Sequence, residues 1–232
     1  MTAVLGQYSH SLFNRLLSVE EAENRFRIAG GISSICDQLE AAASKHPSAA
    51  HFGIQLLHRH SDLDEDEIML GFGRTVLPVK HADIDPAQHS KIHASIWGID
   101  ATTGDFLPLE FAMADKGSGS DIATKADKAL FDDIAQVLKS HDLQDLLGLA
   151  LLNSSNEEEV GLESTQGRAN IIIPLNLMSS PPNAIPVVWE LVAAFGTKKK
   201  CKQVCEVTDK HRGIHIQSYL GPKPRPKPRA RN

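Results

Sequence analysis

The stretch HFGIQLLHRHSDLDEDEIMLGFGRTVLPV, residues 51–79, decides the type of fold because it contains successive strand-like segments. In a strand, alternate side chains share one face, so residues 51–60 would present together Phe52, Ile54, Leu56, His58 and His60. The acidic segment SDLDEDE follows as a turn. Glycines then divide IMLGFGRTVLPV into one or two further strands, and Pro78 indicates an edge strand or a strand end.

Helical patterns precede this stretch. Ser18 and Glu21 form the S-x-x-E capping box that is typical of a helix start. Residues 18–45 therefore predict two short helices, or one helix that is broken at Gly30-Gly31. Within the second part, Cys36 is expected to be a buried helix residue of the core.

After residue 79 the patterns are mostly those of strands. Asp85-Pro86 predicts the start of a short helix, AQHSKIHA. Paired strands are expected at 94–100 and 106–114, a long amphipathic helix at 122–140, and further strands at 146–153, 168–177, 185–196 and 201–209. Helices followed by strands favour an α+β fold over alternating βαβ units: N-terminal helices, a mixed or antiparallel sheet, and one long amphipathic helix packed on it.

Length and composition favour a single globular domain over residues 1–220. The 232-residue chain is 41% apolar and 23% charged, which is ordinary for a soluble globular protein and excludes a wholly disordered one. No apolar run approaches the roughly 18 residues of a membrane span, and no signal peptide is evident, so no membrane partner is expected. Three cysteines do not make a disulfide framework, which predicts a reducing, cytoplasmic setting.

The charges divide the chain unevenly. Residues 1–197 carry 13 basic and 27 acidic residues, whereas residues 198–232 carry 11 and 2. The segment GPKPRPKPRARN, residues 221–232, predicts a disordered basic, Pro-rich tail. The acidic body argues against a broad nucleic-acid-binding face, although the tail alone could contact an anionic partner.

Two groups of metal-binding side chains stand out. The C-terminal spacing Cys-x3-Cys-x5-His-x3-His places four ligands that Zn²⁺ prefers at Cys201, Cys205, His211 and His215. A strand would also point His58 and His60 toward one site. A site that combines both segments and keeps one position open would suit catalysis, whereas a closed Cys2His2 set would be structural.

Two further patterns concern a carboxylate and a second histidine pair. Glu110 lies in the apolar segment FLPLEFAMA, and burial there would raise its pKa and make it a candidate general base or acid. His89 and His93 would share one face of a short helix, but no glutamate follows His89, so a zincin motif is excluded and a solvated face is favoured.

The segments LLHRHSDLDEDEIML (56–70) and LPLEF (107–111), together with the Cys/His-rich end, resemble a group of intracellular fungal proteins, the cyclopenases of viridicatin-type alkaloid pathways, which are hemocyanin-like zinc proteins. The resemblance extends over roughly residues 50–216. It implies a lyase of secondary metabolism that contracts the benzodiazepinedione cyclopenin to the quinolone viridicatin, with loss of methyl isocyanate.

In that reaction, zinc from among the six Cys and His candidates would act as Lewis acid and Glu110 as base. Hemocyanin copper sites use His-x3-His pairs on long helices. Of the two pairs with that spacing, only His89 and His93 lie on a predicted helix, and that helix is short, so copper and a hemocyanin fold are not predicted.

Two alternatives remain open at this point. In one, the protein is a binding module, with a structural zinc in the C-terminal Cys/His cluster and a basic tail that recruits a partner. In the other, it is a metal-free protein that binds or isomerises a small molecule in an apolar pocket containing Glu110.

Overall fold

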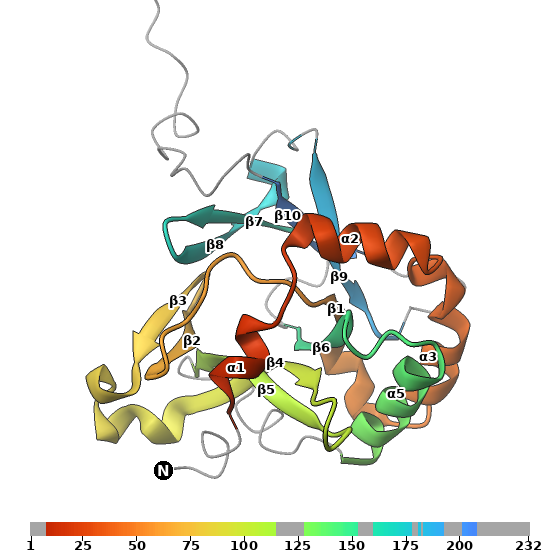
Figure 1. The fold of residues 1–232 in the computed structure, drawn as a ribbon, viewed down its shortest axis with the longest axis horizontal. Coiled ribbons are helices and arrows are strands. Elements are labelled where there is room, and N and C mark those ends of the chain that lie inside the picture. Colours follow the sequence, from red (N-terminus) through yellow and green to blue (C-terminus); the bar gives the residue numbers. More distant parts are fainter. Residues whose placement is uncertain are drawn as a thin grey trace, which may run out of the picture.

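The sheet of this protein closes on itself, and helices pack along one side of it (Figure 1). The computed structural model describes residues 8–114, 128–152, 160–177, 181, 183–192 and 201–207. Within these ranges ten strands form a closed barrel in the order β1-β6-β4-β5-β2-β3-β8-β7-β10-β9, and β9 pairs with β1. Strand pairs are antiparallel except for β2/β5 and β7/β10, which are parallel.

The strands are β1 (Phe52–Leu56), β2 (Glu67–Phe72), β3 (Thr75–Lys80), β4 (Ile92–Ile99), β5 (Phe106–Met113), β6 (Leu147–Leu151), β7 (Gly161–Gln166), β8 (Ala169–Pro174), β9 (Ala184–Glu190) and β10 (Cys201–Glu206). The α-helices are α1 (His10–Asn14), α2 (Val19–Ile28), α3 (Cys36–Ala43) and α5 (Lys128–Ser140). Short 3₁₀ helices are η2 (Ile32–Ser34), η3 (Pro47–His51), η4 (His81–Asp83), η5 (Pro86–Lys91) and η6 (Leu175–Leu177).

Helices and a mixed sheet fit the α+β class that the sequence predicts, whereas closure into a barrel was not predicted. The closed barrel gives β3, which contains Pro78, a neighbouring strand on each side. Strand β3 pairs with β8 only through Thr75 and Val76. Pro78 lies beyond that short ladder, so its missing N–H leaves no ladder hydrogen bond unmade on that side.

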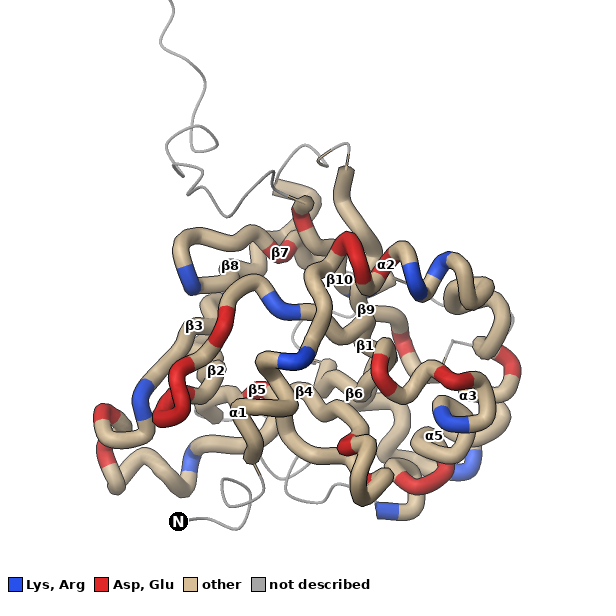
Figure 2. The backbone as a smooth tube through the Cα atoms, in the orientation of Figure 1, with Lys and Arg blue, Asp and Glu red and all other residues tan. Residues whose placement is uncertain are grey.

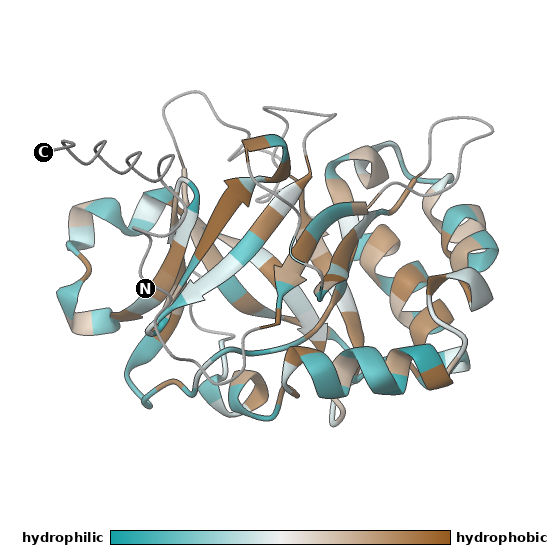
Figure 3. Cartoon of the chain, turned by 90° about the horizontal axis from the view of Figure 1, so that it is seen from above, coloured by the Kyte–Doolittle hydropathy of each residue, from teal (hydrophilic) through white to brown (hydrophobic). Residues whose placement is uncertain are grey.

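An aromatic cluster holds α5 against the barrel. Phe131 makes edge contacts with rings from three strands, at centroid distances of 5.2–5.6 Å: Phe52, Trp97 and Phe106. On α2, Phe26 packs on Trp189 of β9 with tilted rings, at 5.6 Å. Figure 3 shows apolar residues along the strands and on the helices. The main core therefore joins the helices to the barrel strands.

The N-terminal helices begin and end as the sequence predicts. The Ser18 hydroxyl accepts from the Glu21 N–H, and the Glu21 carboxylate accepts from the Ser18 N–H, so the capping box is confirmed. The break falls at Gly30 and Gly31, which both have positive φ. The expectation that Cys36 is buried was wrong, because it opens α3 and is partly exposed.

The helix predicted from residue 86 was wrong beyond its first turn. Asp85 does cap it, accepting from the Ala87 N–H at 2.9 Å, but the turn is 3₁₀ and β4 begins at Ile92. Pairing of Ile92 and His93 with β5 overrides the local helical tendency. His89 and His93 therefore lie on different elements.

The remaining elements agree in part. The described part of the predicted 122–140 helix is α5, while residues 122–127 and the tail at 221–232 lie outside the described residues. The predicted strands at 94–100, 106–114, 146–153, 168–177, 185–196 and 201–209 correspond to β4, β5, β6, β8, β9 and β10, whereas β7 was missed. No helix in the described part of the chain is long and apolar enough to span a membrane.

The aromatic cluster yields a stability prediction. Replacing Phe131 with Ala removes three ring contacts and leaves a cavity under α5, so the free energy of unfolding should fall by about 3–5 kcal/mol. Urea denaturation would measure it. As a control, Phe72→Ala at a ring that is 47% exposed should change it by about 1 kcal/mol or less. Equal effects of the two substitutions would contradict this account of the core.

Candidate metal centre

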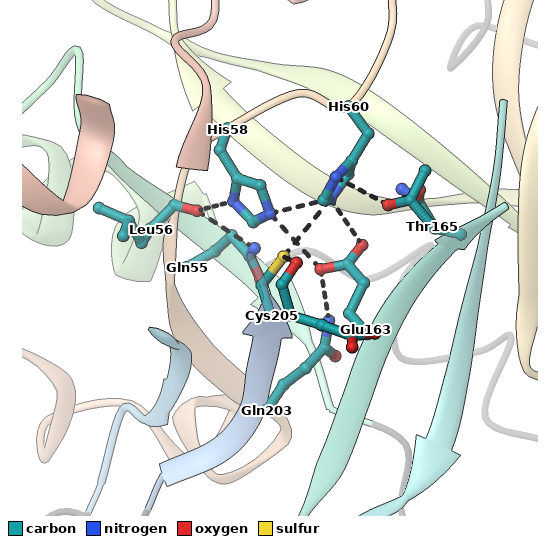
Figure 4. Close-up of polar contacts among 10 residues, drawn as sticks. Gln55, Leu56, His58, His60, Glu163, Thr165, Gln203 and Cys205 are labelled. Atoms are coloured by element: carbon teal, nitrogen blue, oxygen red, sulfur yellow. Dashed lines mark hydrogen bonds and ion pairs between the residues drawn. The ribbon is translucent and has the colours of Figure 1, made fainter. Parts of the chain in front are cut away.

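Four side chains from distant parts of the sequence converge inside the described structure: His58, His60, Glu163 and Cys205 (Figure 4). Their potential ligand atoms all lie within 4.8 Å of one another. The two imidazole Nε2 atoms are 3.1 Å apart, each is 3.4 Å from a Glu163 oxygen, and the Cys205 sulfur is 3.8 Å from His60 Nε2. This cluster could hold a metal ion.

The two histidines lie just past the end of β1. The strand ends at Leu56, and the following segment is fixed by Arg59, whose backbone N–H donates to Leu17 O and whose side chain donates to Leu16 O. Arg59 is thereby held by the linker between α1 and α2, while the residues on either side of it turn to the cluster. The rings of His58 and His60 meet edge to face with centroids 4.8 Å apart. The predicted alternation thus holds beyond the strand itself.

The other two members come from neighbouring parallel strands. Glu163 of β7 and Cys205 of β10 are direct register partners, so their side chains emerge on the same face of the sheet. Thr165 shares the phase of Glu163, and Asn170 is its partner on β8. One face of the β8–β7–β10 sheet is therefore polar and buried, and Thr165 on this face contacts His60.

Hydrogen bonds fix which nitrogen of each neutral histidine is free. His58 Nδ1 lies 2.8 Å from Leu56 O, and since a carbonyl only accepts, this nitrogen carries the hydrogen. Thr165 donates its single hydrogen to Asn170, so it accepts from His60 Nδ1 at 2.9 Å. Both Nε2 atoms then carry lone pairs toward the centre, as in metal-ligating histidines whose other nitrogen is held by an outer partner.

The centre is nearly dry. The exposed fractions of the His58, His60 and Glu163 side chains are 3%, 9% and 11%, and Cys205 is fully buried. Glu163 also accepts a hydrogen bond from the Gln203 amide at 3.2 Å. Two imidazole nitrogens, a sulfur and a carboxylate at such short range favour a positive charge among them, which either protons on the histidines or a metal ion can supply.

The charges within the cluster shift the pKa values of His58, His60 and Glu163. Burial by itself lowers the pKa of His58, but hydrogen bonds to Cys205 and Glu163 outweigh it and raise the pKa well above its ordinary value. Burial also opposes protonation of His60, yet the Glu163 charge and a Cys205 hydrogen bond raise its pKa to about 9. Burial works to raise the pKa of Glu163, but the two histidines hold it far below its usual range. The pocket between these groups therefore attracts a cation.

An ion pair between the buried Glu67 and the partly exposed Arg168 holds the acidic segment that follows His60. Arg168, in the turn between β7 and β8, donates to both oxygens of Glu67 at 3.0 and 2.5 Å and to Asp62 O at 2.7 Å. Asn14 of α1 also exchanges hydrogen bonds with the backbone of Leu63. Figure 2 shows acidic residues along this connection between β1 and β2. This ion pair, the Arg168–Glu67 clamp, joins the loop after the histidines to the turn that follows β7, the strand of Glu163.

Glu110 of β5 lies within electrostatic reach of the centre but outside it. Its carboxylate is partly buried, and no hydrogen bond or ion pair joins it to another described residue. Burial, and then the negative charge of Glu163, raise its pKa to about 7, while His58 and His60 act in the opposite direction. An unpaired carboxyl group that titrates near neutrality beside a metal-binding cluster is a candidate for proton transfer.

The structure brings together only some of the six predicted metal ligands. His58, His60 and Cys205 converge, whereas Cys201 lies apart on β10 with its thiol directed to Gln203 O at 3.2 Å. His211 and His215 lie outside the described residues. Sequence reasoning missed Glu163, because the segment GLESTQ has polar residues in both strand phases and so gives no signal of a buried face.

No protein-family model, curated protein or solved structure matches this chain. The site is therefore interpreted from its own geometry.

The two cysteines of β10 provide a matched test of the centre. Cys205→Ser replaces a converging sulfur and should weaken metal binding by about tenfold or more, whereas Cys201→Ser should leave it unchanged. Competition with a chelating dye would measure both affinities. Equal retention of metal by both variants would remove Cys205 from the centre.

The clamp predicts a pH dependence of stability. The hydrogen bonds from Arg168 hold the pKa of Glu67 below its ordinary 4.5. Its contribution to stability is therefore present above about pH 4.5 and is lost as the pH falls through the lower folded-state pKa. In urea denaturation between pH 3 and 7, Glu67→Gln should be less stable than the parent at pH 7, and the gap should close toward pH 3.

The control for the clamp is Asp66→Asn, which removes the exposed ion pair with Lys80 and should have little effect at any pH. A gap between the parent and Glu67→Gln that stays constant with pH would show that the Glu67 charge does not matter.

Proposed function

We propose that this protein is a zinc-dependent lyase. Its substrate would bind beside Glu110, next to the centre formed by His58, His60, Glu163 and Cys205. One observation carries the proposal. A buried set of four converging donors lies within electrostatic reach of a carboxyl group that no other described residue pairs. A carboxyl group with a purely structural role is expected to be paired when it is buried.

The donor set favours zinc among the biological metals. Two imidazoles and a thiolate are borderline and soft ligands, which Mg²⁺ and Ca²⁺ avoid and Zn²⁺ prefers. The outer contacts from Leu56 O, Thr165 and Gln203 hold these ligands in the orientation that metal binding needs. Zinc bound here would act as a Lewis acid that polarises a carbonyl or epoxide oxygen.

Glu110 would serve as the proton acceptor. Its carboxylate is partly buried, which strengthens its basicity, and no described residue forms a hydrogen bond or ion pair with it. A base whose pKa lies near the working pH can take a proton and later return it. The acid–base group and the Lewis-acid centre would then act on opposite ends of one polar group of the substrate.

The resemblance to the cyclopenases supplies the reaction for this proposal. Glu110 would take the anilide proton of a cyclopenin-type benzodiazepinedione, and the aromatic ring would form a bond to the epoxide carbon as the epoxide C–O bond breaks. Methyl isocyanate would leave, and water would convert it to carbon dioxide and methylamine. The remaining product is a viridicatin-type quinolone.

A second candidate follows from the number of ligands. Four protein donors can complete a tetrahedron, which is typical of structural zinc. In that case the metal would hold β7, β10 and the segment after β1 together, and the protein would be a binding module. Absence of turnover in the zinc-loaded protein would favour this candidate.

The role of Glu110 predicts a loss of rate without a loss of structure. Glu110→Gln keeps the shape of the side chain but removes the base, so turnover of cyclopenin should fall by about 10² or more. Metal content and melting temperature should remain those of the parent. A Glu206→Gln variant, which changes a carboxylate on β10 that accepts from Ser164, is the control and should keep its turnover. Full activity of Glu110→Gln would remove it from the mechanism.

If zinc is the catalytic metal, the purified protein should contain zinc and its turnover should depend on it. Untagged protein, purified without added metal, should contain about one zinc per chain. Removal by a chelator should abolish cyclopenin turnover, and stoichiometric Zn²⁺ should restore it. Denaturation of the metal-free protein, followed by circular dichroism, separates the two candidates. A fold that survives while turnover is lost supports catalysis, whereas a fold that is lost with the metal supports the structural role.

A further inference from the structure

Gln203 of β10 is a half-buried amide that contacts the candidate metal centre from one side (Figure 4). Its Nε2 donates to Glu163 Oε2 at 3.2 Å, and its register partner on β7 is Gly161, which adds no side chain between them. The β9–β10 ladder shifts its register on both sides of Gln203, after Cys201 and again before Val204. Irregularities of this kind re-aim side chains next to functional sites. The local shape of the strand thus directs the amide to Glu163.

The four donors of the centre are not held equally. Outer hydrogen bonds at Nδ1 fix both imidazoles, at 2.8 Å for His58 and 2.9 Å for His60. The sulfur of Cys205 is one carbon away from the backbone of β10 and is fully buried. Glu163 has a longer side chain, and a carboxylate oxygen is a harder donor than imidazole or thiolate, so it matches zinc least well. Glu163 is therefore the ligand that can leave most easily.

The centre leaves little room for a fifth ligand. Four donor separations of 3.1–3.8 Å lie close to those on one tetrahedral zinc, which are roughly 3.3–3.6 Å for metal–ligand bonds of roughly 2.0–2.3 Å. The side chains of His58, His60 and Glu163 are at most 11% exposed. Catalytic zinc needs an open position. A protein ligand must therefore give way before another molecule can bind the metal here.

Gln203 gives the carboxylate of Glu163 a partner if it leaves the metal. A buried carboxylate without a hydrogen-bond donor is strongly destabilised, and the amide already supplies one to Oε2. On the metal, the carboxylate shares its charge with the ion, which weakens this hydrogen bond. Off the metal, the carboxylate keeps its full charge, so the bond is charge-assisted and stronger. The amide therefore stabilises the displaced carboxylate more than the bound one.

We propose that Glu163 is the exchangeable ligand of the centre, and that Gln203 is the positioning residue that holds its carboxylate when another donor takes its place. This inference rests on the proposed function and explains how a centre with four protein donors can be catalytic. The incoming donor is a carbonyl or epoxide oxygen of the substrate. One metal–oxygen bond breaks and another forms, the number of ligands stays at four, and no proton or electron is transferred.

The spectroscopic test uses the full chain with Co²⁺ in place of zinc and azide as the probe. Zn²⁺ has a filled d shell and no visible bands, whereas Co²⁺ has visible bands whose intensity falls as the number of ligands rises from four to five. Azide should bind the parent protein by exchange, so the bands should shift and keep their intensity. A loss of intensity would indicate addition of a fifth ligand, and an unchanged spectrum would indicate no exchangeable ligand. Either result would overturn the proposal.

A double-mutant cycle separates positioning from a purely structural role. Gln203→Leu keeps the size of the side chain but removes the donor, so the azide affinity of the Co²⁺ protein should fall by about tenfold. In a Glu163→Ala protein saturated with Co²⁺ there is no carboxylate to hold, so Gln203→Leu should have no further effect. Cys201→Ser on the same strand is the control and should bind azide as the parent does. An equal effect of Gln203→Leu in both backgrounds, or no effect in either, would overturn the proposal.

Turnover separates this inference from the proposed function. If the zinc protein turns over cyclopenin but Gln203→Leu binds azide as the parent does, only the exchange of Glu163 fails. If cyclopenin is not turned over while azide binding follows the cycle, the lyase proposal fails and the exchangeable ligand is supported.

Discussion

Four electron-pair donors that face one another inside a protein need a positive charge between them. This constraint governs the barrel, because His58, His60, Glu163 and Cys205 bring their donor atoms within 4.8 Å and almost no water reaches them. The carbonyl of Leu56 and the Thr165–Asn170 pair hold both imidazoles with their lone pairs inward. Protons on the two histidines can supply this charge, and a metal ion in their place would be coordinated by all four side chains.

The barrel meets this constraint through two features of its pairing. The parallel register of β7 and β10 sets Glu163 beside Cys205 on one face. Closure of β9 on β1 then brings the segment after β1 to the same place. The ion pair between Arg168 and Glu67 holds the loop beyond the histidines to the β7–β8 turn, so the two halves of the centre are joined by a contact outside it. Cys205 belongs to the same buried cluster as Phe52 and Phe131, so the apolar core under α5 adjoins the polar centre.

Local patterns in the sequence predicted the parts of this arrangement that local physics controls. The capping box at Ser18, the alternation that places His58 with His60, and the buried setting of Glu110 each follow from a few neighbouring residues. Long-range pairing controls the rest. Glu163 could not be found because its burial depends on β10, which lies about forty residues away in the sequence. The helix expected around His93 gave way to pairing with β5 for the same reason. Closure of the sheet likewise has no local signature.

The separation of the ligands along the chain has a consequence for biosynthesis. His60 and Cys205 are 145 residues apart, and β10 is the last strand that the structure describes. The complete set of four ligands is therefore available only after β10 has been synthesised. A metal ion held by all four would act as a reversible cross-link between distant parts of the chain, as disulfides do in oxidising compartments.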